Sequence, residues 1–299
     1  MLKVKRKKFK VKREKSTVQK MVTKFLNHFI LTPFTVTFPS FLLILQKIPD
    51  MEIVLHQYDH LNSTNEEALR LVADGRAKEG LVLQTYKQKQ GRGTGKNRWE
   101  SEPGKNLTFS LVLCPHFLEP SQQFVLTEMV SLALFEVVER RLGSEYLSIK
   151  WPNDLWFKGK KLAGVLVQNR IKGSRLDFSV IGVGMNVNQK KFLTDAPNPA
   201  SMIHFSGKEE NLPGLLDEIL KQLGYYYDKI ETDIKSLEDL YLQKLYRIDE
   251  WGEYGDKAGV FIAKITGTDR YGRLLMTDRQ GNLRVYGFKE VTFLPERLQ

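Results

Sequence analysis

The chain has 299 residues, 41% of them hydrophobic and 27% charged, which is an ordinary globular composition. Its one cysteine, Cys114, excludes an internal disulfide, and one cysteine with five histidines gives little support for a zinc cluster. The net charge of +11 is concentrated in residues 1–50, whose 12 basic and 2 acidic residues leave +1 for the rest. The basic pI is therefore no argument that the body of the protein binds nucleic acid.

The first fifty residues have an unusual pattern. A lysine-rich run is followed by 22 residues without a formal charge, 25–46, which reach transmembrane length. Pro33 and Pro39 make this a poor spanning helix, and no small-residue cleavage site marks a signal peptide. We interpret residues 1–50 as a disordered extension or a start placed upstream of the natural one, with Met51 as the natural start. Membrane association and a nucleic-acid tail remain as second and third interpretations.

Hydrophobic periodicity predicts an α+β body in which strands surround one long helix. In chain order we expect a strand over 52–58, a helix from 63 to 75, a strand over 80–86, a glycine-rich loop over 88–104, a strand over 106–114, a helix over 121–142, a strand from 147, a hairpin over 155–169, a strand over 176–187, a helix over 212–247, and short strands over 259–293. The last group has the spacing of a small separate β unit.

The most informative stretch is the loop sequence Gly91-Arg-Gly-Thr-Gly-Lys-Asn-Arg-Trp. A dinucleotide-binding loop is excluded because a strand follows where that motif needs a helix. A P-loop is excluded because Gln90 and Asn97 stand where it needs glycine and a hydroxyl residue. Glycine backbone N–H groups can cradle anionic oxygens, and arginine adds a forked charge. The loop alone fits an anion site and an ordinary basic surface loop equally well.

Three further segments resolve this ambiguity: Lys150-Trp-Pro-Asn-Asp, Lys161-Leu-Ala-Gly-Val-Leu-Val-Gln and Gly182-Val-Gly-Met-Asn-Val-Asn. With Ser63-Thr-Asn and Gln88 they resemble the biotin–protein ligase family (biotin–[acetyl-CoA-carboxylase] ligases, or biotin holoenzyme synthetases) in order and spacing. The resemblance covers roughly residues 51–299. It implies a class II synthetase-like catalytic domain with a mixed or antiparallel sheet over 51–250 and a small C-terminal β-barrel over 251–299.

The resemblance also implies a reaction. An ATP-dependent ligase of this family forms biotinyl-5'-AMP from biotin and ATP, with Mg²⁺, and transfers biotin to a lysine of an apo biotin carboxyl carrier domain of a biotin-dependent carboxylase. Residues 1–50 lack a helix-turn-helix pattern, so we expect a monofunctional ligase with no specific nucleic-acid partner. We expect a cytoplasmic protein, and the sequence leaves a homodimer open.

The resemblance assigns roles to particular residues. The catalytic residues are expected to be Lys161, Arg92, Lys150 and Asp154. The biotin-binding residues are expected to be Ser63, Thr64, Asn65, Gln88, Arg92, Gly93, Thr94, Lys161 and Gly164. The ATP-binding residues are expected to be Gly91, Lys96, Trp99, Asn153 and Asn186, with Asp154 and Asn186 as Mg²⁺ ligands. Structural alternatives remain: Ser63 has the position of a helix cap, and Trp99 is also suited to core packing.

Two positions depart from the family pattern. Many members have arginine where this chain has Thr94, so we expect biotinyl-AMP to dissociate faster here. Gln168 stands where an acidic residue is common, and the sequence offers no physical account of its effect.

Three other functions compete with the ligase interpretation. A lipoate or octanoate ligase of the same fold favours a different glycine-rich signature and lacks the Lys-Trp-Pro-Asn-Asp segment. A nucleic-acid-binding regulator is suggested only by the basic residues 1–50, and deleting them would remove its salt-dependent binding. A membrane-tethered protein rests on the uncharged stretch 25–46 and predicts that the full chain and a Met51 start fractionate differently.

Overall fold

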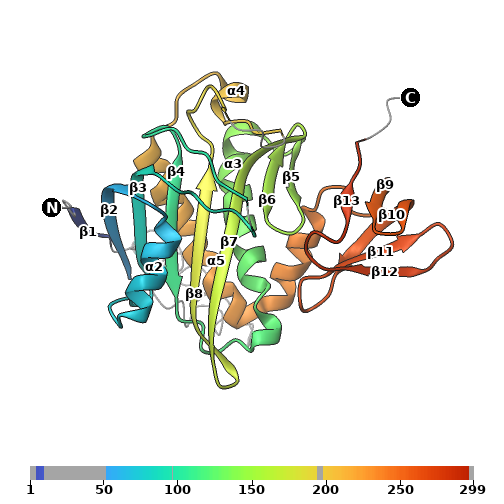
Figure 1. Cartoon of the computed structure of the whole chain (residues 1–299), viewed down its shortest axis with the longest axis horizontal. Helices are drawn as coiled ribbons and strands as arrows, with labels where there is room; N and C mark the ends of the chain where they lie inside the picture. Colours follow the sequence, from blue (N-terminus) through green and yellow to red (C-terminus); the bar gives the residue numbers. More distant parts are fainter. Residues whose placement is uncertain (1–4, 10–51, 96, 194–197, 296–299) are drawn as a thin grey trace, which may run out of the picture.

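The computed structural model describes residues 5–9, 52–95, 97–193 and 198–295. Its centre is an eight-stranded mixed sheet, so the predicted α+β class is confirmed (Figure 1). In spatial order the strands are β1 (Lys5–Phe9), β2 (Ile53–Leu61), β3 (Leu81–Gln88), β4 (Leu107–Leu113), β8 (Arg175–Met185), β7 (Lys160–Lys172), β6 (Asp154–Phe157) and β5 (Leu147–Lys150). Only β2 and β3 pair in parallel, and the other neighbours are antiparallel.

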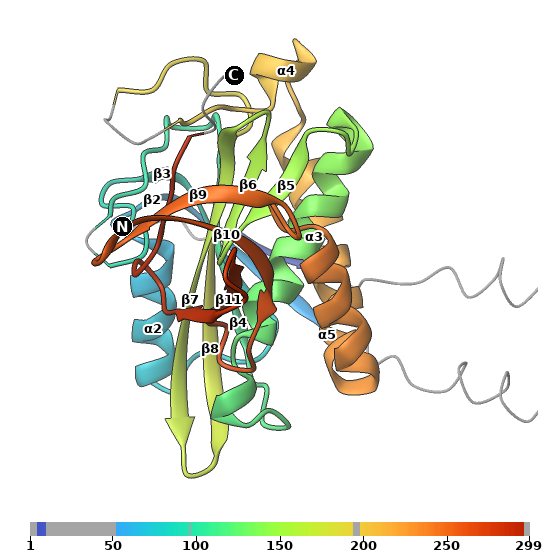
Figure 2. The same cartoon turned by 90° about the vertical axis from the view of Figure 1, so that its right-hand side faces the viewer.

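Helices cover both faces of this sheet. Helix α2 (Thr64–Ala73) connects the parallel pair and lies on one face, while α3 (Val125–Leu142) and α5 (Leu212–Gln243) lie together on the other (Figure 2). A parallel pair needs a crossover connection, and α2 is part of the connection from β2 to β3. It starts just after the end of β2, which lies beside the end of β3. This connection brings the Ser63-Thr-Asn segment to the same sheet edge as Gln88.

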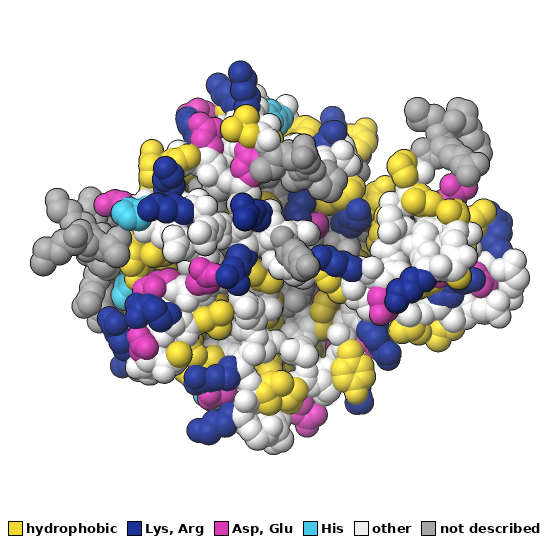
Figure 3. Space-filling view, in the orientation of Figure 1, with side chains coloured by type: hydrophobic (Ala, Val, Ile, Leu, Met, Phe, Trp, Pro, Cys, Tyr) yellow, Lys and Arg dark blue, Asp and Glu magenta, His cyan; other side chains and the backbone are white. Residues whose placement is uncertain are grey.

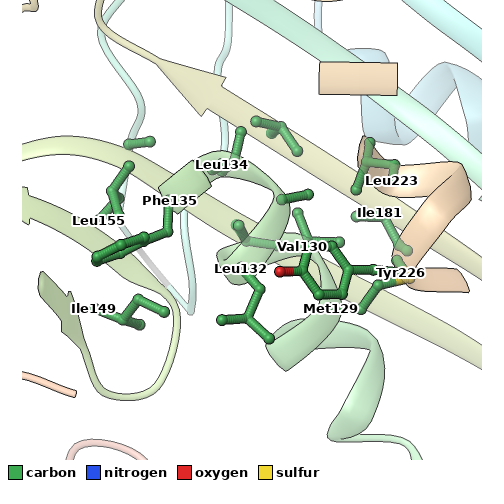
Figure 4. Close-up of a cluster of buried hydrophobic side chains, with 14 of the residues drawn as sticks. Met129, Val130, Leu132, Leu134, Phe135, Ile149, Leu155, Ile181, Leu223 and Tyr226 are labelled. Atoms are coloured by element: carbon green, nitrogen blue, oxygen red, sulfur yellow. The ribbon is translucent and has the colours of Figure 1, made fainter. Parts of the chain in front are cut away.

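The main core lies between the sheet and α3. All seven residues of β4 are buried, since the strand is central and both of its faces are covered. Helix α3 is buried over most of its length and packs against strands and α5 (Figure 4). The labelled core side chains are Met129, Val130, Leu132, Leu134, Phe135, Ile149, Leu155, Ile181, Leu223 and Tyr226.

The C-terminal unit is a second, five-stranded antiparallel sheet that extends from one end of the body (Figure 1). Its strands are β9 (Trp251–Asp256), β10 (Gly259–Thr268), β11 (Leu274–Asp278), β12 (Leu283–Tyr286) and β13 (Thr292–Phe293). Their pairing order is β12-β11-β10-β9-β13. A small β unit is therefore confirmed, whereas closure into a barrel stays a prediction.

Two short helices differ from the prediction: the long helix expected from residue 121 begins at Val125, after a 3-10 turn, and no helix was expected at 203–206. The two are the 3-10 helix η2 (Pro120–Gln122) ahead of α3, and the one-turn helix α4 (Ile203–Ser206). Helix α5 also differs from the prediction of a continuous helix, because Asp233 has non-helical backbone angles. The Asp233 side chain accepts a hydrogen bond from the backbone N–H of Ser236, so it caps the second half of α5.

Part of the predicted N-terminal extension is described. Residues 5–9 form β1, which pairs antiparallel with β2 at the sheet edge. The interpretation of residues 1–50 as a disordered extension or an upstream start stays a prediction. The rest of 1–50, including the uncharged stretch 25–46, lies outside the described residues. No helix in the described part of the chain is long and apolar enough to cross a membrane.

Candidate active site

Two adjoining cavities contain nearly all the predicted site residues. The inner cavity, about 50 Å³, lies between the start of α2, the glycine-rich loop and strands β7 and β8. The outer cavity, about 700 Å³, lies between that loop, the β5–β6 turn and the C-terminal unit. Both cavities are lined by Gly93, Thr94, Trp99, Asn153, Asp154 and Lys161. One extended ligand that occupied both cavities would therefore pass between these six residues.

The start of α2 forms one wall of the inner cavity. Ser63 is the N-cap, as its position predicted, and its Oγ accepts from the backbone N–H of Glu66 at 3.5 Å. Thr64 and Asn65 follow in the first turn and are each only 4% exposed. Their short polar side chains are thus held in the protein interior, where polar groups need defined partners.

Gln88 ends β3 and faces the start of α2. Its Oε1 accepts from the backbone N–H of Thr64 at 3.0 Å and lies 3.4 Å from Thr64 Oγ1. The next residues form the glycine-rich loop, in which Arg92 forms an ion pair with Glu66 of α2. This ion pair ties the loop to the wall of the inner cavity.

Trp99 closes the other side of the inner cavity. A Cβ on Gly184 would lie 2.3 Å from the Trp99 ring, so only glycine lets the indole lie against β8. A Cβ on Gly91 would lie 2.3 Å from the backbone oxygen of Trp99. Gly91, predicted to contact ATP, lines neither cavity and instead allows this close approach of the two loop segments. Lys96 lies outside the described residues.

Lys161 and Asp154 stand where the two cavities meet. Lys161 Nζ lies 2.7 Å from Asp154 Oδ1, and the two side chains are 30% and 24% exposed. Asp154 begins β6, Lys161 is the second residue of β7, and Gly164 lies opposite Asp154 in the pairing of these strands. The Lys161 ammonium is therefore held in place by a carboxylate and remains accessible from both cavities.

Lys150 is the second cation of the outer cavity. Its Nζ lies 4.1 Å from the centre of the Trp156 ring and 5.0 Å from that of Phe293. Burial lowers the pKa of this ammonium, and the nearby positive charge of Lys161 adds to the effect, whereas Asp154 opposes it. Lys150 is thus a partly desolvated cation held against aromatic rings, a suitable contact for an anionic ligand.

Oxygen atoms suited to a magnesium ion lie in the same cavity. Asn186 Oδ1 is buried without a hydrogen-bond partner among the described residues, and Asp154 supplies a carboxylate. Within the described part of the chain no three His, Cys, Asp or Glu side chains form a metal cluster. Mg²⁺ bound to nucleotide phosphates commonly takes only one or two protein ligands, so Asp154 and Asn186 fit the ion.

Several lining residues were not predicted. Phe288, Lys289 and Phe293 of the C-terminal unit line the outer cavity, and Lys289 Nζ donates to the backbone oxygen of Thr94 at 3.4 Å. On the face shown in Figure 3, Lys and Arg side chains surround the region where the body meets this unit. Ser110 of β4 was also missed, although it contacts both Thr64 and Asn65.

Comparisons with known proteins identify the family of the chain. The sequence profile described as the Biotin/lipoate A/B protein ligase family matches residues 59–186. The bifunctional ligase/repressor BirA of Bacillus subtilis (strain 168) is 30% identical over 239 residues, which cover 77% of this chain and 71% of that protein. The chain therefore belongs to the biotin/lipoate A/B protein ligase family.

Other relatives extend the comparison. The biotin–[acetyl-CoA-carboxylase] ligase of Paracoccus denitrificans is 35% identical over 129 residues, covering 42% of this chain and 51% of that protein. Among solved structures, a point mutant of the Aquifex aeolicus biotin protein ligase, in complex with biotin, is 26% identical with a TM-score of 0.63. It matches over 81% of this chain and 98% of its own.

Proposed function

We propose that this chain is an ATP-dependent biotin–protein ligase. It would join biotin to AMP and then transfer the biotinyl group to a lysine of an acceptor protein. The observation that carries the proposal is the junction of two unlike cavities at Lys161 and Asp154. On one side of this junction lies a cavity walled mainly by neutral polar side chains, and on the other lies a larger cavity that Lys150, Lys289 and Arg98 also line.

The first step brings two anions together. A biotin carboxylate oxygen attacks the α-phosphorus of ATP, the bond from that phosphorus to the bridging oxygen breaks, and its electron pair leaves with pyrophosphate. In this proposal Lys161 would hold the carboxylate and an α-phosphate oxygen, and Lys150 would hold the outer phosphates, since both line the outer cavity. Positive groups fixed where charge develops are the main requirement for such a transfer.

A magnesium ion would neutralise phosphate charge when bound, and Asp154 and Asn186 are the residues that would hold it.

The second step is an acyl transfer. The neutral amine of an acceptor lysine attacks the acyl carbon of biotinyl-AMP, the bond to the phosphate oxygen breaks, and AMP leaves with that electron pair while the amine loses a proton to solvent. As acceptor we propose an apo carrier domain of a biotin-dependent carboxylase, and as compartment the cytoplasm. A homodimer is a separate prediction that a mass measurement in solution would test.

The inner cavity favours biotin over lipoate or octanoate. Its walls carry the side chains of Ser63, Thr64, Asn65 and Gln88, which suit an uncharged ureido head. Each of these side chains already has a partner in the protein, but a fatty acyl chain or a dithiolane ring would remove their remaining hydrogen-bonding capacity from water without using it, which costs binding free energy.

The test is incorporation of labelled biotin into an apo carrier domain with ATP and Mg²⁺. The full chain and a Met51 start are compared with Lys161→Ala, and unlabelled lipoate and octanoate serve as competitors. Labelling by both wild-type forms, loss in Lys161→Ala and no competition would support the proposal. Transfer of octanoate or lipoate without transfer of biotin would overturn it.

A further inference from the structure

A buried polar chain runs behind the inner cavity through Gln168, Asn65, Ser110 and Thr64. Asn65 Nδ2 donates to Gln168 Oε1 at 3.0 Å and to the backbone oxygen of Leu166 at 3.3 Å. Asn65 Oδ1 lies 2.6 Å from Ser110 Oγ, which lies 2.8 Å from Thr64 Oγ1. Ser110 is fully buried, with 0% of its surface exposed.

Hydrogen bonds to backbone groups fix which atoms donate and which accept at both ends of this row of polar side chains. A carbonyl oxygen only accepts, so the contact with Leu166 O requires that Asn65 present its NH₂ group there. The Asn65 oxygen therefore faces Ser110. At the other end, the backbone N–H of Thr64 requires that Gln88 present its oxygen. Neither amide can turn over without losing a hydrogen bond to the backbone.

The hydroxyl protons then have one consistent arrangement. Asn65 Oδ1 can only accept, so the single Ser110 proton is donated to it. Ser110 Oγ has no second proton for Thr64, so the Thr64 hydroxyl donates to Ser110 Oγ at 2.8 Å or to Gln88 Oε1 at 3.4 Å. Both acceptors lie in the protein, and the Thr64 oxygen is left with only lone pairs for the inner cavity.

We propose that Ser110 is a specificity-determining positioning residue that makes Thr64 a hydrogen-bond acceptor toward the ligand. It does not line the inner cavity and acts through Thr64. The proposal rests on the proposed function and deepens it: at Thr64 the site requires a ligand N–H, as in a cyclic urea, and rejects a ligand oxygen. Asn65, expected to bind biotin, acts in this account by orienting Ser110.

The polar chain also accounts for Gln168. The position needs an acceptor for Asn65 Nδ2, and a carboxylate accepts as well as an amide oxygen. Gln168→Glu is therefore expected to leave biotin affinity within about twofold, whereas Gln168→Met, which lacks the acceptor, weakens it by about threefold to tenfold.

The test compares biotin with its two cyclic carbamate analogues, in each of which one ureido N–H is replaced by a ring oxygen. Binding is measured directly by calorimetry, without turnover. The wild-type chain is expected to reject the analogue whose oxygen faces Thr64 by about 100-fold or more. In Ser110→Ala the Thr64 proton keeps only the long 3.4 Å contact with Gln88 Oε1 and can turn toward the ligand, so that discrimination falls by about tenfold. Discrimination against the other analogue stays unchanged.

Ser179→Ala is the matched control, because Ser179 is equally buried in neighbouring β8 and its Oγ has no partner among the described residues. ATP binding in the outer cavity reports that each variant is folded. Thr64→Val removes the hydroxyl acceptor itself and should also lower the discrimination between biotin and the carbamate analogue. This variant tests the proposal if Ser110→Ala does not fold. Unchanged discrimination in a folded Ser110→Ala or Thr64→Val overturns the proposal. A wild-type chain that binds no biotin overturns the proposed function, and this inference falls with it.

Discussion

The two cavities differ in how their walls are held. Most walls of the inner cavity are neutral side chains on α2 and β3: Thr64 is buried, Gln88 is half-buried, and the backbone N–H of Thr64 donates to Gln88 Oε1. The outer cavity is built from partly exposed lysines and from loops of two separate units, and Lys289 reaches Thr94 across a sequence separation of 195. The difference indicates that the inner cavity selects its ligand through hydrogen-bond donors and acceptors whose positions are fixed. The outer cavity instead supplies positive charge on side chains that can adjust during the reaction.

The largest effect is expected where the two cavities meet. Lys161→Ala removes the cation at the reacting carboxylate, so the rate of biotinyl-AMP formation should fall by about 10²–10³-fold. Lys172→Ala, at the exposed end of the same strand, is the control. A rate within threefold of wild type for Lys161→Ala would show that Lys161 takes no part in the reaction. It would also contradict the assignment of the reactive charge to the outer cavity.

The next largest effect is expected for a substitution that changes only the outer cavity. Lys150→Met should weaken ATP binding by about 10- to 100-fold and leave biotin binding unchanged, because Lys150 lines only the outer cavity. Calorimetric titration with each ligand separately checks this. Equal losses for both ligands would show that the two cavities are not independent.

Lys150 also predicts a pH dependence. Burial lowers its pKa from the ordinary 10.5, so its charge is lost at a less alkaline pH than that of an exposed lysine. ATP affinity should therefore fall as the pH rises through this lowered pKa. Lys150→Arg keeps its charge and should retain affinity to higher pH. Identical alkaline limits for wild type and Lys150→Arg would contradict this role.

A smaller effect is expected at Thr94. Asn153 Nδ2 lies 3.4 Å from Thr94 Oγ1, and Thr94 lines both cavities. An arginine there would add a forked charge beside the adenylate, so Thr94→Arg should slow biotinyl-AMP dissociation by about tenfold. Stopped-flow release of the intermediate measures it, with Thr94→Gln as the uncharged control. An unchanged dissociation rate would show that this chain retains the intermediate by other contacts.

The smallest effect on activity should come from Glu128, a core residue of α3. Burial raises its pKa from 4.5 to about 8, with a further contribution from Glu238, whereas Lys235 opposes the rise. The folded state thus keeps the proton that the unfolded chain loses. The contribution of Glu128 to the free energy of unfolding is complete below about pH 4.5 and is lost as the pH rises through about 8. The free energy of unfolding falls by up to about 1.4 kcal/mol per pH unit over this range. Glu128→Gln should flatten this dependence in denaturant unfolding, and an unchanged slope would contradict it.

Much of the fold followed from the sequence because its signals were local. The alternation in β4, the capping pair Ser63 and Glu66, and the turn at Gly159 each depend on neighbouring residues. The break at Asp233 was not predicted, because the apolar spacing of α5 continues across it.

The site was predictable only where motifs marked it. Lys161 and Asp154 belong to such segments, and the structure brings them together. Ser110 carries no signal, since one serine in an apolar strand resembles any buried small residue, and its meaning comes from α2 folding over it. Lys289 was seen only as a turn residue, because its contact with the loop depends on how the C-terminal unit packs.

The most direct test of the account is exchange of labelled pyrophosphate into ATP, which reports the first step without any acceptor protein. We predict that biotin supports exchange, that octanoate and lipoate do not, and that Lys161→Ala abolishes it while Ser179→Ala does not. Exchange supported by octanoate or lipoate but not by biotin would contradict the account, because the inner cavity would then select a different acyl group.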